Sequence, residues 1–191
     1  MMLRSALSAV LAAALLIGLP AAATTMLKID LTGLSQTADV VVHGTVRRTE
    51  SRWSSDRRRI VTDVEIEVTE TLKGQAGSTV LITQPGGRVD GIGQIVHGMA
   101  TFATGEEVVV FLDHHGPRAF HVTGMAQGKY QVRRSEDSRS VMAVPESTGD
   151  ALLLDPTTRQ PTGSGQKALT LDELKAAIRT ALQQSEQEKR Q

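Results

Sequence analysis

A run of arginines around the single tryptophan of the chain is the pattern best suited to bind a ligand. The set comprises Arg47, Arg48, Arg52, Trp53, Arg57, Arg58 and Arg59. Guanidinium groups form forked hydrogen bonds with phosphate, sulfate and carboxylate groups, and an exposed indole stacks on sugars or peptides. In a polar loop between two strands, these residues predict a binding site for an anionic glycan or an acidic protein surface. The alternative is a solvated, arginine-rich hairpin in which Trp53 folds back onto the domain.

Histidines clustered in the sequence are the candidate metal ligands. They are His114, His115 and His121, and Asp113 supplies a carboxylate beside them. Imidazole and carboxylate groups bind zinc, but neighbouring side chains on a strand point to opposite faces, so only one of His114 and His115 faces His121. The spacing matches no recognised metal motif. We therefore expect a solvated strand end, with no metal and no other cofactor.

Patterns typical of enzymes are scarce. The chain contains neither the G-x-S-x-G elbow of hydrolases nor the H-E-x-x-H helix of metalloproteases. Asp63, Glu65 and Glu67 alternate along one strand, which is typical of the solvated face of a sheet, and His43 is interpreted as a buried, hydrogen-bonded histidine. The glycine-rich residues 86–93 lack the G-x-G-x-x-G spacing and the following helix of a phosphate site. We predict a binding module without catalytic activity; an enzyme with an unrecognised site is an alternative.

Short strands separated by glycine-containing turns position these residues. Residues 39–48 and 107–112 each contain an apolar run, Val40–Val42 and Val108–Leu112, which predicts central strands of a closed or covered sheet. Residues 60–72 alternate between apolar and acidic side chains, which predicts a strand with one buried face. Residues 50–56 are predicted as a polar loop. Further strands are expected at 78–84, 92–96, 120–122 and 130–132. The predicted fold class is mainly β: an OB-like, closed or partly open antiparallel barrel of about five to seven strands with a C-terminal α-helix.

Changes in composition predict the boundaries along the chain. Residues 1–23 are predicted to be a signal peptide, because Arg4 precedes an apolar run and Pro20 is followed by small residues. Cleavage after Ala23 predicts a secreted or periplasmic protein without a stable membrane anchor; an uncleaved anchor is the alternative. Residues 24–134 are assigned to the barrel. Residues 135–169, rich in proline, glycine, serine and threonine, are predicted to be a loop or linker.

A helix is predicted at residues 170–185, followed by a frayed tail at 186–191. Thr170 and Glu173 form a capping box, in which each side chain accepts a hydrogen bond from the backbone of the other residue. Apolar residues then recur at helical spacing at Leu171, Leu174, Ile178 and Leu182. The stripe predicts a helix that docks on the barrel; a partner-binding helix is the alternative.

Composition excludes several classes of function. The chain has no cysteine, which excludes disulfides, thiolate metal sites and a cysteine nucleophile. Its 21 basic and 21 acidic residues balance, so the strong positive field of a nucleic-acid-binding protein is absent and no nucleic-acid partner is expected. Aromatic residues make up only 3% of the chain, too few for a wide stacking platform.

Three blocks of the sequence resemble a known family. They read Ala-Asp-Val-Val-Val-His-Gly-Thr-Val at 38–46, Val-Glu-Ile-Glu-Val-Thr-Glu-Thr-Leu-Lys-Gly at 64–74, and Gly-Glu-Glu-Val-Val-Val-Phe-Leu at 105–112. This order is similar to that of the netrin-like domains, including the tissue inhibitors of metalloproteases, and of uncharacterised bacterial secreted proteins with the same blocks. The resemblance implies an OB-type five-stranded barrel and, as an alternative function, a regulator or inhibitor of an exported protease. The inhibitors place an N-terminal cysteine on the catalytic zinc, whereas the predicted N-terminus here is Thr24.

Overall fold

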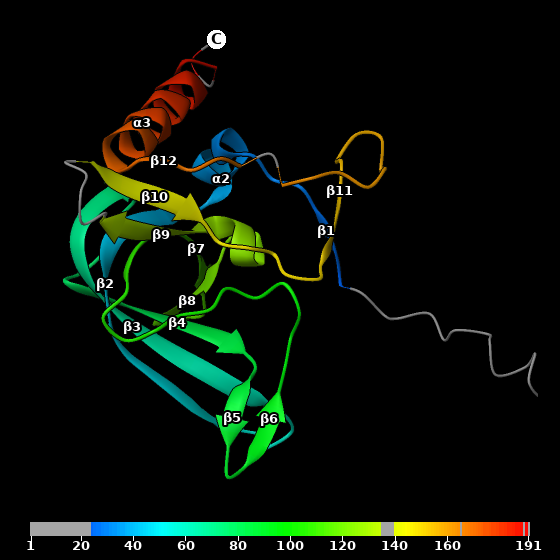
Figure 1. Ribbon diagram of the computed structural model, residues 1–191. Helices are drawn as coiled ribbons and strands as arrows, with labels where there is room; N and C mark the ends of the chain where they lie inside the picture. The colour runs from blue at the N-terminus through cyan, green and yellow to red at the C-terminus, as the bar shows by residue number, and fades with distance from the viewer. Residues whose placement is uncertain (1–23, 135–139, 165, 189, 191) are drawn as a thin grey trace, which may run out of the picture.

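The computed structural model describes residues 24–134, 140–164, 166–188 and 190. The predicted signal peptide at 1–23, with its cleavage after Ala23, lies outside the described residues. The described chain is mainly β, with one large sheet and a C-terminal helix (Figure 1). This confirms the predicted class in outline.

The large sheet has eight strands in the order β12-β10-β9-β7-β2-β3-β4-β8. They are β2 (Val40–Trp53), β3 (Ile60–Lys73), β4 (Thr79–Pro85), β7 (Glu107–His115), β8 (Ala119–Val122), β9 (Lys129–Arg134), β10 (Val141–Pro145) and β12 (Leu169–Thr170). Strand β8 also pairs with β7, so the sheet curls until its edge strand returns to a central one. The β4–β8 joint is a single residue pair, Ile82 with Phe120.

Two hydrophobic cores explain the apolar runs of the central strands, Val40–Val42 in β2 and Val108–Leu112 in β7. Val40, Val42 and Val110 belong to the core enclosed by the curled strands, together with residues of β3, β4 and β8. Val41 and Phe111 point the other way, into a second core formed with the helices and with β9 and β10. Successive side chains of a strand point to opposite faces, and here both faces are covered. The prediction of central, covered strands is therefore confirmed for residues 40–46 and 108–112, whereas Arg47 and Arg48 are exposed.

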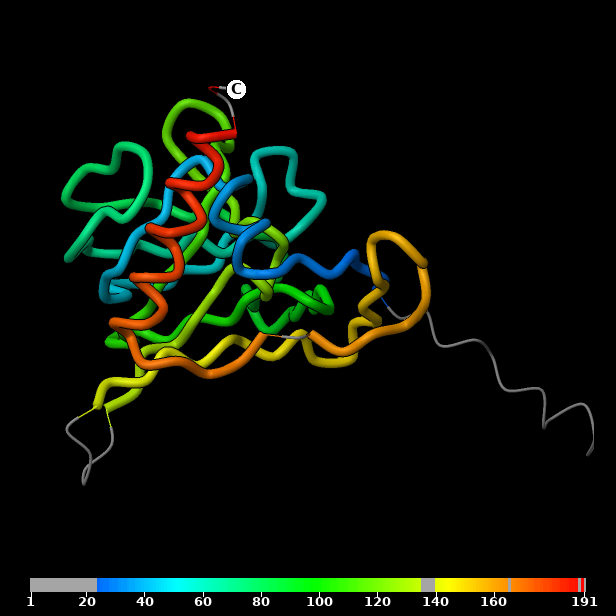
Figure 2. Tube along the Cα trace, turned by 90° about the horizontal axis from the view of Figure 1, so that it is seen from above, coloured from blue at the N-terminus to red at the C-terminus, as the bar shows by residue number. Residues whose placement is uncertain are grey.

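Shorter elements complete the fold. Strand β1 (Thr25–Leu27) pairs in parallel with β11 (Leu152–Leu154), and β5 (Gly87–Val89) forms a hairpin with β6 (Ile92–Gln94). Helix α2 (Leu31–Thr37) begins at Asp30, whose carboxylate accepts a hydrogen bond from the backbone of Gly33. A 3₁₀ turn, η1 (Met125–Gly128), links β8 to β9. Seen from above, α3 (Leu171–Glu188) crosses the molecule beside α2 (Figure 2).

The prediction of a loop or linker over residues 135–169 is wrong at Val141–Pro145 and Leu152–Leu154, which form β10 and β11, and at Leu169, where β12 begins; residues 135–139 and 165 lie outside the described residues. Strand β10 pairs with β9 along its whole length, from Val141 opposite Arg134 to Pro145 opposite Tyr130. Ala143 of β10 is fully buried. Composition favoured a loop, but the five residues Val141–Pro145 are enough to add a strand to the edge formed by β9, and this pairing satisfies their backbone hydrogen bonds. This addition raises the main sheet above the five to seven strands expected.

Helix α3 confirms the predicted C-terminal helix and its role in the core. The backbone of Glu173 donates to Thr170 Oγ1 at 3.2 Å, and the backbone of Thr170 donates to Glu173 Oε2 at 2.8 Å, as the capping box requires. Leu174 and Ile178 are fully buried in the second core. The helix continues to Glu188, so residues 186–188 of the predicted frayed tail are helical. Among the described residues, no helix has the length and apolarity needed to cross a membrane.

Ion pairs at the edge of α3 tie it to β3 and make its docking sensitive to pH. Glu70 accepts hydrogen bonds from Lys175 Nζ at 2.6 Å and from Arg179 Nη2 at 3.0 Å. These contacts, the Lys175 hydrogen bond foremost, hold the pKa of the Glu70 carboxyl below its ordinary value. A lowered pKa means that the stabilising contribution is complete above the unfolded-state value and is lost as the pH falls through the folded-state value.

We therefore expect the free energy of unfolding to fall between about pH 5 and pH 3, and to fall less in Glu70→Gln than in the wild type. Urea denaturation at both pH values measures this difference. Glu65→Gln is the matched control, because Glu65 is an exposed carboxylate of the same strand, and it should keep the wild-type decrease. An identical decrease in Glu70→Gln and the wild type would contradict the assignment.

Candidate functional site

The arginines predicted to lie in a loop are divided between a strand and a turn. Arg47, Arg48, Arg52 and Trp53 belong to β2, which remains paired with β3 as far as Trp53 opposite Ile60. The predicted polar loop at 50–56 is therefore wrong in its first half, and only residues 54–59 form a turn. The strand persists because its neighbour β3 has the same length of 14 residues and pairs with it throughout.

The strand arginines are neutralised by acidic residues beside them. Arg47 Nη2 lies 3.0 Å from Glu67 Oε1, and Arg52 Nε lies 2.6 Å from Asp63 Oδ2. Arg48 pairs with Glu50 of its own strand. These pairs are largely exposed, so they add little to stability. Their consequence is electrostatic: the solvated face of the β2–β3 hairpin carries alternating charges of both signs rather than a positive strip.

The turn arginines remain available to a ligand. Arg57, Arg58 and Arg59 are exposed, and none of them forms an ion pair with any residue that the structure describes. Trp53 is half-buried at the base of the same turn. We call these residues the arginine tip: Trp53, Arg57, Arg58 and Arg59. The predicted site is thus reduced to the end of the hairpin.

Short polar contacts hold the arginine tip in one shape. Ser54 donates from its backbone to the carbonyl of Arg59 at 2.8 Å and from its hydroxyl to Asp56 Oδ1 at 2.6 Å. Asp56 also accepts from the backbone of Arg58 at 3.2 Å. The Ser54 hydrogen bond is the main cause of a lowered pKa of the Asp56 carboxyl. Asp56 is therefore a carboxylate at neutral pH and is committed to the turn.

The β5–β6 hairpin lies against the same end of the sheet (Figure 1). Its Gly87 approaches β2 and β3 so closely that a Cβ atom there would lie 2.3 Å from Ser51 Oγ and 2.5 Å from Thr62 Oγ1. The hairpin and the segment after it expose two large apolar side chains, Ile92 at 55% and Ile95 at 83%. This end of the sheet therefore carries exposed arginines on one hairpin and exposed apolar side chains on and after the other.

The histidines confirm the predicted division between two strand faces. His115 stacks on His121 with ring centroids 3.6 Å apart, whereas His114 packs on Phe120 on the opposite face. His121 Nδ1 is also 2.7 Å from the carbonyl oxygen of Thr83. In the part of the chain that the structure describes, no group of three or more histidines and acidic residues could hold a metal ion.

His43 is buried and hydrogen-bonded, as predicted. Its Nε2 lies 2.8 Å from Glu107 Oε1, and Glu107 also accepts two hydrogen bonds from Arg134. Burial raises the pKa of the Glu107 carboxyl, but the contacts from His43 and Arg134 outweigh burial, so this pKa lies below its ordinary value. The arrangement neutralises a charge at the edge of the second core.

A buried lysine is the polar feature that sequence reasoning missed. Lys129 is 1% exposed, and its Nζ lies 2.7 Å from Glu106 Oε1 and 3.1 Å from Glu146 Oε2. It also donates to the carbonyl oxygen of Thr101, and its ammonium group lies 4.8 Å from the ring centroid of Phe102. We call Lys129, Glu106 and Glu146 the ion triad.

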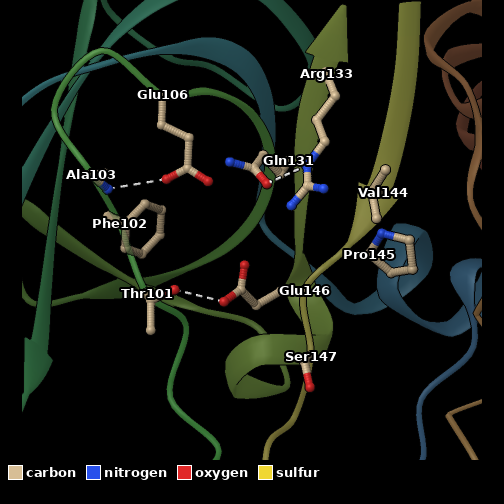
Figure 3. Close-up of a pocket in the computed structure, with 10 residues that line it drawn as sticks. All are labelled: Thr101, Phe102, Ala103, Glu106, Gln131, Arg133, Val144, Pro145, Glu146 and Ser147. Carbon is tan, nitrogen blue, oxygen red and sulfur yellow. Dashed lines mark hydrogen bonds between the residues drawn. The ribbon is translucent and has the colours of Figure 1, made fainter. Parts of the chain in front are cut away.

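Two members of the ion triad, Glu106 and Glu146, line a pocket of about 440 Å³. Figure 3 shows the carboxylates of Glu106 and Glu146 and the guanidinium of Arg133 turned toward its centre, with the Phe102 ring on one side. Lys129 uses its three protons on Thr101, Glu106 and Glu146. It is therefore an ionic anchor rather than a free amine for chemistry. Because its partners come from positions 101, 106 and 146, no local pattern around Lys129 could have indicated it.

Neither a scan against protein-family models nor a search of curated proteins found a match to this chain.

Proposed function

We propose that the chain is an exported, non-catalytic binding module of OB type that binds an anionic polysaccharide through the arginine tip. The observation that carries the proposal is the contrast between paired and unpaired arginines on one hairpin. Arg47, Arg48 and Arg52 have acidic partners, whereas the consecutive arginines of the turn have none among the described residues. Unpaired guanidinium groups bind sulfate or carboxylate groups without first breaking an internal ion pair.

The position of the tip in the fold supports the same proposal. The tip joins β2 and β3, which are the first two strands of the curled sheet in chain order. In OB folds the loop between the first two strands contacts oligosaccharides and oligonucleotides. The pairing of β8 with both β7 and β4 is consistent with a barrel of this type. The balanced overall charge favours a local contact over a diffuse one.

The indole of Trp53 supplies the second part of a glycan site. Aromatic rings stack on the apolar faces of sugars and on cations or peptides, and Trp53 lies half-buried at the base of the turn. The indole provides one stacking surface, and the exposed arginines provide several anion-binding groups. This combination fits a polysaccharide that carries both anionic groups and sugar rings.

The triple variant Arg57→Gln, Arg58→Gln, Arg59→Gln is expected to bind immobilised heparin about five- to a hundredfold more weakly than the wild type, since each exposed charge pair contributes about 0.3–1 kcal/mol. Elution salt on the column and equilibrium titration at 0.15 M salt measure the loss. The charge-matched control is Arg118→Gln, Lys167→Gln, Arg190→Gln, at exposed positions elsewhere. Equal losses in both triples would show that net charge alone governs retention, contrary to the proposal.

Replacing Trp53 with alanine separates a glycan from an acidic protein as the partner. Weaker binding to heparin with unchanged binding to poly-glutamate supports stacking on sugar rings. Unchanged binding to both polymers contradicts the glycan assignment.

A further inference from the structure

A second concave site lies at the open end of the curled sheet, apart from the arginine tip. It is a cavity of about 670 Å³ between the end of β4, the β5–β6 hairpin and residues 95–102. Its lining includes Gln84, Arg88, Val96, Met99 and Phe102. This volume is within the range of about 300–1,000 Å³ that is typical of small-molecule sites, which often occupy the mouths of β-barrels.

A cation and an apolar wall complete the cavity. Arg88 is exposed and forms no ion pair with the described residues. Its Nε is the nearest atom, at 3.9 Å, to the position that a Cβ atom of Gly93 would occupy. Val96, Met99 and Phe102 contribute apolar surface, and Ile95, 83% exposed, also lines the cavity. An acidic group next to an apolar body therefore fits these residues.

We propose that this cavity binds an amphipathic organic anion: a compact apolar body that carries one acidic group. The apolar body packs on Val96, Met99 and Phe102. The acidic group pairs with Arg88. The proposal does not depend on the arginine tip, because none of the four tip residues lines the cavity.

A pair of fluorescent dyes tests each part of this assignment. The dye 2-anilinonaphthalene-6-sulfonate has an apolar body, an N–H donor and a sulfonate, and N-phenyl-2-naphthylamine has the same skeleton without the sulfonate. The wild type is expected to bind the sulfonated dye saturably, with an affinity about fivefold higher than for the neutral dye, as one exposed charge-assisted contact provides. No saturable binding of the sulfonated dye overturns the proposal.

Variants with matched controls locate the dye. Arg88→Gln should lower the affinity for the sulfonated dye about fivefold and leave the affinity for the neutral dye unchanged. Arg118→Gln should change neither affinity. Gly93→Phe should lower the affinity for both dyes at least about tenfold, because a side chain at this position enters the cavity mouth without a backbone clash. Gly163→Phe is its control, since a Cβ at Gly163 meets nothing within 4 Å.

The outcomes are decisive in both directions. Selective losses in Arg88→Gln and Gly93→Phe support the site. Wild-type affinity in either variant, or equal losses in the controls, overturns it. Circular dichroism of each variant confirms that the fold is intact, and both substituted positions lie on the exposed hairpin. Heparin binding is measured on the same variants, so failure of this site and failure of the arginine tip are distinguished.

Discussion

Lys129→Met is expected to lower the free energy of unfolding by about 3–5 kcal/mol, the cost of removing one partner from a buried ion pair. The lysine is 1% exposed, and the side chains of Glu106 and Glu146 are only 8% and 17% exposed. Methionine keeps the apolar stem beside Phe102 but removes the ammonium group. Two carboxylates then face each other with no cation between them, and the carbonyl of Thr101 loses its donor.

The rescue of this variant tests the mechanism. The triple variant Lys129→Met, Glu106→Gln, Glu146→Gln has no unpaired buried charge, so it should recover much of the lost stability. Urea denaturation followed by circular dichroism measures all three proteins. A loss below about 1 kcal/mol in Lys129→Met would contradict the ion triad as a buried anchor, and so would a triple variant less stable than the single one.

Leu174→Ala is expected to lower the free energy of unfolding by about 3 kcal/mol, within the range of 2–5 kcal/mol for large-to-small changes in a core. Leu174 is fully buried in the second core, with 0% of its surface exposed to solvent. Its removal leaves a cavity between α3 and the sheet. Thermal and urea denaturation of the described fold measure the loss directly.

The matched control is Leu81→Ala, because Leu81 is 37% exposed on β4. The same change of side chain there should cost about 1 kcal/mol or less. If both variants lost equally little stability, α3 would be a loosely attached helix, as the partner-binding alternative requires. A large loss confined to Leu174→Ala places the apolar stripe of α3 in the core.

Local patterns in the sequence predicted the elements that depend on local physics. The alternation of Val64, Glu65 and Ile66 predicted β3 with its correct buried face, and the capping box of Thr170 and Glu173 predicted the start of α3. These features depend on neighbours within four residues along the chain. Strand β10 was missed because its pairing partner, β9, supplies the stability that its own composition does not indicate.

The charges of the candidate site could not be assigned from the sequence. Arg47 pairs with Glu67 and Arg52 with Asp63 only because β2 and β3 meet in one register. That register shifts at irregularities, one of them between Val46 and Arg48. Each shift changes which side chains are opposite one another. The sequence therefore identified the arginines but not which of them lack an ionic partner among the described residues.

The sequence by itself determined that the chain forms a mainly β fold with covered central strands and a docked C-terminal helix. The spacing of apolar residues along the chain is a local property. Because an apolar face must be buried, that spacing decides which face of a strand or helix turns toward the core. Only the tertiary structure decided that the tip arginines have no ionic partner among the described residues, that Lys129 is buried between Glu106 and Glu146, and that Arg88 lines a cavity together with apolar residues. The physical reason is that ion pairs and cavities depend on contacts between distant segments, whose register and packing no local pattern encodes.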